Sequence, residues 1–169
     1  MIKSFSTGTI IVLCTALIEA ALLSNIMVLP TVPDLSLICV LYISLQNGKL
    51  MGETTGFMSG LFLDFLSASP WGLNCLYRTI LGYIGGIFCK TINTDGVFIP
   101  CVLGFSATIA KALFIWVISV LYPSGIFSYS PISKIFIFEL CANTILTPII
   151  FKFLFLFKNA LLLDPEKVI

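Results

Sequence analysis

Six apolar stretches, joined by short polar loops, account for nearly all of this chain and decide what it can fold into. The stretches lie at residues 5–24, 34–47, 49–67, 73–92, 97–121 and 134–158. A helix needs around 20 apolar residues to cross the roughly 30 Å hydrocarbon core of a bilayer. Most of the stretches reach or approach that length, whereas residues 34–47 would cover only about 21 Å as a helix. The sequence therefore predicts an all-α integral membrane protein, a single compact bundle of six transmembrane helices over residues 1–169.

The composition supports the same class. Hydrophobic residues make up 59% of the 169 residues, charged residues make up 10%, and the mean hydropathy is +1.11. A soluble domain has about 25% charged residues. The formal net charge is +1, and no basic patch is present that could bind nucleic acid. We therefore expect membrane lipids, and not nucleic acid, around this protein.

The chemistry of an enzyme is poorly represented in the chain. Histidine is absent, which removes the commonest general base and the commonest metal ligand. The six cysteines lie singly within apolar runs and never form a C-x-x-C pair, so we interpret them as small hydrophobic residues. No nucleophile turn or phosphate loop is recognisable. We expect a protein without catalytic residues, cofactor or metal.

The stretch from Gly48 to Ser67 is unusual because it combines glycines with two acids in an apolar helix. At 100° per residue, the residues Glu53, Gly56, Gly60 and Asp64 fall within an arc of about 80°. Glycines at a spacing of four allow another backbone to approach closely, and a carboxylate in hydrocarbon must face protein or water. This face is therefore expected to point into the helix bundle.

Further charges lie inside the other predicted spans. Together with Asn143, the ionisable residues within the spans are Glu19, Glu53, Asp64, Arg78, Lys111 and Glu139. A charge at the bilayer centre costs about 2.5–3.5 kcal/mol on insertion scales, so these groups are expected to pair. Across neighbouring helices, Arg78 can pair with Asp64 or Glu53. Lys111 can pair with Glu139, with Asn143 as a polar neighbour.

The role of these charges is left open by the sequence. They could be structural ion pairs, an interface for a partner's helix, or a path for protons or substrate. Glu19 lies near the end of its span, so it either sits at headgroup level or turns inward toward a partner.

The distribution of basic residues predicts the orientation. With the N-terminus in the cytoplasm, six lysines lie at cytoplasmic ends against two basic residues at the opposite ends. The six are Lys3, Lys49, Lys90, Lys152, Lys158 and Lys167, and the two are Arg78 and Lys134. Both termini are therefore expected in the cytoplasm.

Several local patterns together point to a family. Pro33-Asp34-Leu35 opens the second span, and residues 52–64 follow the pattern G-x-x-x-G-F-x-x-G-L-x-x-D, with Gly72-Leu73 shortly after. Asn143 and Pro148 form N-x-x-x-x-P in the last span. With these patterns the chain resembles, over nearly its whole length, the bacterial rod shape-determining MreD family.

The resemblance implies a non-enzymatic subunit of the cell-elongation complex in the bacterial cytoplasmic (inner) membrane. Its implied partner is MreC, and through MreC the MreB filament, RodA and the class B penicillin-binding transpeptidase that works with RodA. The implied fold is similar to the six-helix substrate-binding subunits of energy-coupling-factor transporters. The expected packing or partner interface consists of Gly52, Glu53, Gly56, Gly60, Asp64 and Arg78.

A second hypothesis is a vitamin-binding subunit of an energy-coupling-factor importer. Ala16 and Ala20 have the four-residue spacing through which such subunits dock their energising partner. A solvent-reached pocket near the outer face, with several converging hydrogen-bond donors, would favour this importer. A solid interior would favour a scaffold.

Overall fold

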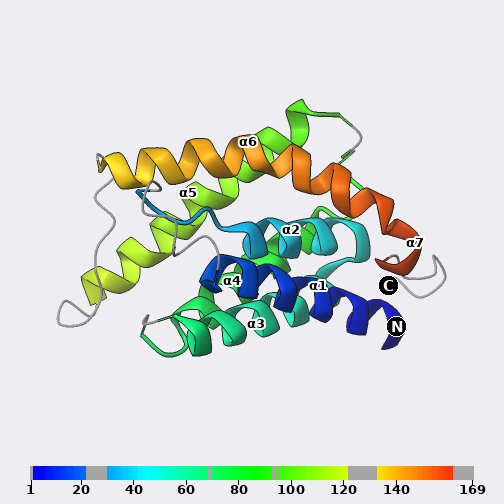
Figure 1. Ribbon diagram of the computed structural model, residues 1–169, viewed down its shortest axis with the longest axis horizontal. Coiled ribbons are helices and arrows are strands. Elements are labelled where there is room, and N and C mark those ends of the chain that lie inside the picture. The colour runs from blue at the N-terminus through cyan, green and yellow to red at the C-terminus, as the bar shows by residue number, and fades with distance from the viewer. Residues whose placement is uncertain are drawn as a thin grey trace.

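The computed structural model describes residues 2–21, 30–67, 70–92, 94, 96–121 and 133–161, and regular structure within these residues is entirely helical. The elements, labelled in Figure 1, are α1 (Ile2–Ala21), α2 (Leu35–Asn47), α3 (Lys49–Leu66), α4 (Leu73–Ile87), α5 (Phe98–Leu121), α6 (Lys134–Leu156) and the short α7 (Lys158–Leu161). The all-α prediction is confirmed, and each of the six predicted stretches coincides with one helix.

The helix ends differ from the predicted ones chiefly in α4. This helix ends at Ile87, although the apolar stretch continues to residue 92. The N–H of Phe88 donates a hydrogen bond to the carbonyl of Gly85, and Lys90 adopts a left-handed conformation with a φ of 61°. The Lys90 N–H then bonds the carbonyl of Leu45 at the end of α2, so a contact between helices replaces the last turn.

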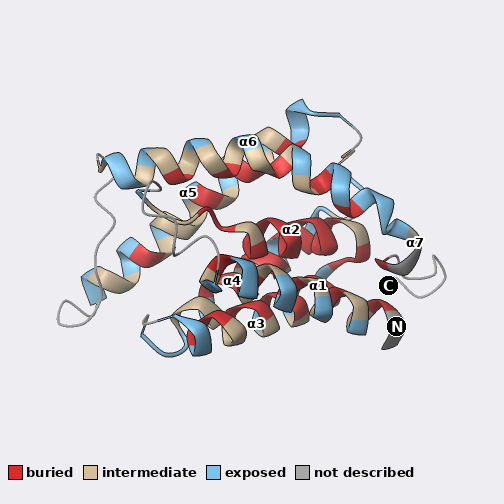
Figure 2. Cartoon of the chain, viewed as in Figure 1, coloured by how far each residue is buried: buried red, intermediate tan, exposed pale blue. Residues whose placement is uncertain are grey.

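The shortest helix, α2, lies at the centre of the bundle. It contacts α1, α3, α4 and α6, and eleven of its thirteen residues are buried. Figure 2 shows α2 buried along almost all of its surface, whereas α5 and α6 expose much of theirs. At 1.5 Å per residue α2 is only about 20 Å long. Its first turn therefore begins inside the bundle.

The glycines of α3 bring its backbone against that of α4. A methyl group on Gly52 would overlap the carbonyl of Gly82, and one on Gly56 would overlap the carbonyl of Arg78. One on Gly60 would overlap the backbone of Cys75. The backbone that lies against these glycines is that of α4, a helix of the same chain.

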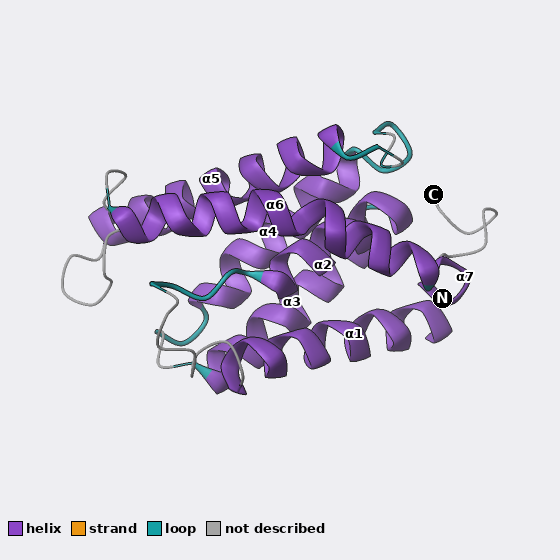
Figure 3. Ribbon diagram, turned by 45° about the horizontal axis from the view of Figure 1, so that its top comes forward, coloured by secondary structure: helices purple, strands orange, loops and turns teal. Residues whose placement is uncertain are grey.

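Within the described part of the chain, three helices are long and apolar enough to cross a membrane, with candidate spans at Ser4–Ala21, Phe98–Leu121 and Lys134–Leu156. Figure 3 shows α5 and α6 side by side, with α1 on the other side of α2 and α3. Helix α2 is apolar but shorter than a span. That all six helices cross the bilayer stays a prediction.

The packing of α3 on α4 makes a testable prediction. Gly52→Ala should lower the free energy of unfolding by about 1–3 kcal/mol, because the added methyl group has no space beside Gly82. The measurement is an SDS titration of the protein purified in dodecyl maltoside, followed by far-ultraviolet circular dichroism. Gly96→Ala is the control, because no atom beyond Gly96 and its two chain neighbours lies within 4 Å of the added carbon among the described residues. Equal unfolding midpoints for the two variants would contradict this packing.

Candidate functional site: a charged cluster at the start of α2

The first turn of α2 has backbone N–H groups that no residue of its own helix can accept, as at the start of any helix. Each has a partner. The Asp34 N–H donates to Oδ1 of Asn143 over 2.9 Å, and the Ser36 N–H donates to Oε1 of Glu19 over 2.6 Å. The Leu37 N–H donates to Oδ1 of Asp34 over 3.1 Å, while the Leu35 N–H bonds the Pro33 carbonyl. Side chains from α1 and α6 thus complete a buried helix start.

Two basic side chains hold the Asp34 carboxylate. Arg78 forms an ion pair with Oδ1, and Nζ of Lys111 lies 2.9 Å from Oδ2. Nζ of Lys111 also lies 2.6 Å from Oε1 of Glu139, so the predicted pair between Lys111 and Glu139 is present. Arg78 is 2% exposed and Asp34 is 4% exposed. Burial of these charges is tolerated because each has a counter-charge and further hydrogen bonds.

The Arg78 guanidinium extends the cluster to α3 and back to α1. It donates to the hydroxyl groups of Tyr77, Ser36 and Ser59. Ser36 in turn donates to Oε2 of Glu19 over 3.1 Å. Asn143 donates to Thr108 of α5 over 3.1 Å. The cluster therefore has members on all six of the longer helices, α1 to α6.

Asp64 performs a separate task at the start of α4. Its carboxylate accepts backbone N–H bonds from Gly72, Asn74 and Cys75 at 3.0 to 3.2 Å, and a side-chain bond from Asn74. Gly72 has a φ of +86°, a conformation that favours glycine. An anion at a helix N-terminus is favourable because of the N–H groups and the dipole. The run ending at Asp64, followed by Gly72, thus forms a cap between two helices.

Two of the predicted contacts are wrong. Arg78 pairs with Asp34 of α2, not with Asp64 or Glu53. Asp64 has its acceptor positions filled by the α4 N-terminus. Adjacency in the sequence favours pairs between helices joined by one loop, whereas α4 packs on α2 as well as on α3.

Glu53 is exposed, although it was predicted to share the buried side of α3 with Asp64. Both residues lie at the margin of that side, which is centred on Gly52, Gly56 and Leu63. The N-terminus of α4 covers Asp64 at one end of the helix. Glu53 lies about 16 Å away toward the other end, where its side chain is exposed.

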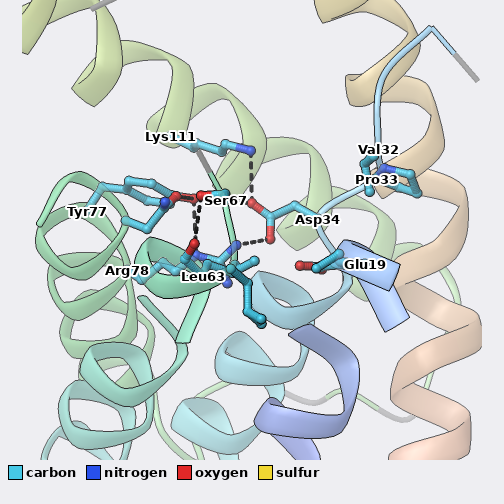
Figure 4. A pocket seen from close by; sticks show the side chains of 12 residues that line it. Glu19, Val32, Pro33, Asp34, Leu63, Ser67, Tyr77, Arg78 and Lys111 are labelled. Atoms are coloured by element: carbon cyan, nitrogen blue, oxygen red, sulfur yellow. Dashed lines mark hydrogen bonds and ion pairs between the residues drawn. The ribbon is translucent and has the colours of Figure 1, made fainter. Parts of the chain in front are cut away.

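A cavity of about 330 Å³ opens beside this cluster (Figure 4). Glu19, Asp34, Tyr77, Arg78 and Lys111 line it on one side. Its apolar and weakly polar lining consists of Ala20, Val32, Pro33, Leu63, Leu66, Ser67 and Asn74. Figure 4 shows Glu19, Asp34 and Lys111 converging on the same space from different elements. Among the described residues, no group of three His, Cys, Asp or Glu side chains could hold a metal ion.

Sequence reasoning missed the central residue of the site. Asp34 was named only as part of the Pro33-Asp34-Leu35 pattern that opens the second predicted span, and it was not among the charges expected to pair. Glu19 was left between two orientations, and the structure supports the inward one, since it is 5% exposed. The signal available for both was the short second stretch, which at about 21 Å does not reach across a hydrocarbon core of roughly 30 Å.

The comparison with known proteins agrees with the local patterns. The family described as rod shape-determining protein MreD matches residues 1–157. The chain belongs to the MreD family. The match includes every member of the charged cluster and all of α1 to α6, and it excludes α7. No curated protein and no solved structure matches the chain. MreD is a shape-determining membrane protein, so a role in rod shape and a membrane location follow for this chain.

The charged cluster predicts a graded loss of stability. Asp34→Ala should lower the free energy of unfolding by about 3–5 kcal/mol, because it removes the cap of α2 and leaves two buried cations without this carboxylate. Asp34→Asn keeps a side chain that can cap the helix, so its loss should be smaller. SDS titration of the purified protein measures both.

Glu53→Gln is the matched control, because it removes one carboxylate from an exposed position. Its unfolding free energy should stay within about 0.5 kcal/mol of the parent protein. If Asp34→Ala and Glu53→Gln have the same unfolding midpoint in SDS, a stabilising role for the cluster is ruled out.

Proposed function

We propose that this chain is a non-enzymatic, multi-pass subunit of the bacterial cell-elongation complex that binds MreC and helps regulate peptidoglycan synthesis. The family match over residues 1–157 is the observation that carries the proposal. MreB, RodA and its class B penicillin-binding partner would be reached indirectly through MreC. A scaffold role agrees with side chains that are used to hold helices together, with ion pairs linking α2, α4, α5 and α6.

The proposed orientation has six spans and both termini in the cytoplasm. Exposed lysines at the end of the bundle that holds the N-terminus support it, namely Lys49, Lys90, Lys152 and Lys158. The opposite end has exposed Lys134. Arg78 was counted among the basic residues at the opposite ends of the spans. Because it is buried in the cluster and does not lie in a loop, it is not evidence against this orientation.

For the MreC interface we propose the outer face of α3. The glycines, Asp64 and Arg78 of the predicted interface are engaged within the chain, which leaves Glu53 as its exposed member. Glu53 lies among large exposed apolar side chains of the same helix, including Leu50 at 60% and Phe57 at 46% exposure. A carboxylate on an apolar helix face is a suitable acceptor for a polar group of a transmembrane partner.

The importer alternative receives little support. Ala16 is fully buried, so it is not available for docking an energising subunit. The cavity beside Asp34 exists, but Arg78 and Lys111 there already bind carboxylates of this chain. At about 330 Å³ it is at the small end of the range for ligand pockets.

The function is tested by replacement in a rod-shaped bacterium that lacks its own MreD. Expression of this chain should restore rod shape, whereas Asp34→Ala should not, because its fold is weakened. Cell length-to-width ratio is the measurement. If the chain reaches the membrane and co-purifies with the host MreC, yet cells stay round, a shape-determining role in that host is refuted.

The interface is tested by co-purification with MreC. Glu53→Lys should lower the recovery of MreC about tenfold, as for the loss of one charge-assisted contact, while the amount of tagged protein is unchanged. Phe105→Ala is the control, because it alters an exposed side chain on α5. Undiminished recovery with Glu53→Lys would exclude this face of α3 as the MreC interface.

A further inference from the structure

The charged groups around the cavity do not balance. Glu19, Asp34, Asp64 and Glu139 are joined, directly or through Asn74, Tyr77 and Ser36, to two basic residues, Arg78 and Lys111. The N-termini of α2 and α4 together contribute roughly one further positive unit, at about half a charge each. With all acids ionised, the cluster keeps an excess of about one negative charge. An uncompensated charge in such a buried site is costly.

The excess can be assigned to Glu19. In the described part of the chain, the ion pairs within 4.0 Å join Asp34 to Arg78 and Lys111, and Glu139 to Lys111, and none includes Glu19. Its two oxygens accept the backbone N–H and hydroxyl of Ser36, one bond each. A carboxylate has about four acceptor positions. Glu19 lies in the last turns of α1, where the helix dipole also disfavours a negative charge.

The cavity supplies the space that a counter-ion for Glu19 would need. Glu19 lines it together with the ion-paired groups of Asp34, Arg78 and Lys111 and with the apolar side chains of Ala20, Leu63 and Leu66. An ammonium group with a short carbon chain matches an acid that has no ion pair within the described residues and the apolar wall next to it.

The position of the cavity indicates where such an amine comes from. Most of the lining residues lie at the last turns of α1 and α3, just before α2 and in the first two turns of α4, and Lys111 reaches the cavity from within α5. Trp71, which follows α3 and is 76% exposed, stacks edge-on with Phe65 at the same end. Exposed tryptophan at helix ends is typical of the headgroup level of a membrane.

We propose that this cavity binds the primary ammonium group of a phospholipid headgroup, with Glu19 as its acceptor. The ammonium group donates to the Glu19 carboxylate and neutralises the cluster. The apolar wall formed by Leu63 and Leu66 contacts the carbons next to the headgroup. This inference is independent of MreC binding.

Lipid retention tests the site. The purified full-length protein in dodecyl maltoside is mixed with equal amounts of dioleoyl phosphatidylethanolamine and dioleoyl phosphatidylcholine, and retained lipid is counted by native mass spectrometry. Choline has no N–H to donate, so the protein should retain phosphatidylethanolamine about tenfold more often, the factor expected for one charge-assisted hydrogen bond. Equal retention of both lipids by the parent protein would overturn the proposal without reference to any variant.

Two variants locate the binding. Glu19→Gln should abolish the preference, and Ala20→Leu should do so by filling the cavity while Glu19 is kept. Glu53→Gln, which removes a carboxylate at an exposed position, should retain it. A preference that survives Glu19→Gln would overturn the assignment. If added free ethanolamine displaces the retained phosphatidylethanolamine, the site binds soluble amines and the assignment to a lipid is overturned. If lipid retention is unaffected by ethanolamine, the lipid is the source of the ammonium group.

Discussion

A helix that starts inside a membrane bundle must have its first N–H groups satisfied by protein, because no water is available there. Helix α2 starts among the other helices, and a cluster of buried polar side chains serves it. Asn143, Glu19 and Asp34 accept its N–H groups, and Arg78 and Lys111 pair with the carboxylate of Asp34. These two ion pairs accompany the use of the buried Asp34 carboxylate as a cap.

The same requirement is met differently at α4. There the acceptor comes from the preceding helix, as Asp64 binds three N–H groups across a short turn. The two caps are connected through Asn74 and Tyr77. Helices α2, α3 and α4 are thereby fixed at one end by polar contacts and along their length by close backbone packing. Helices α5 and α6 join this core through Lys111 and Glu139.

The sequence was sufficient for the helices and for part of the cluster. Hydrophobic length located all six helices, and the cost of charge in hydrocarbon predicted that Lys111 and Glu139 pair. The partner of Arg78 could not be predicted, because it depends on α4 crossing α2, which follows from side-chain packing and not from the order of helices. Glu53 shows a second limit, since helical periodicity gives the side of a helix on which a residue lies but not how far neighbouring loops extend along it.

The short length of α2 also explains why the molecule is hollow at one end. Val32, Pro33 and Asp34, which line the cavity, are the residues that directly precede this helix. Two more helical turns at its N-terminus would add about 11 Å and occupy the same volume. The void and the buried charges thus have one origin in the truncation of a single central helix, and a lengthened α2 would remove the hollow and displace the site of the cluster together.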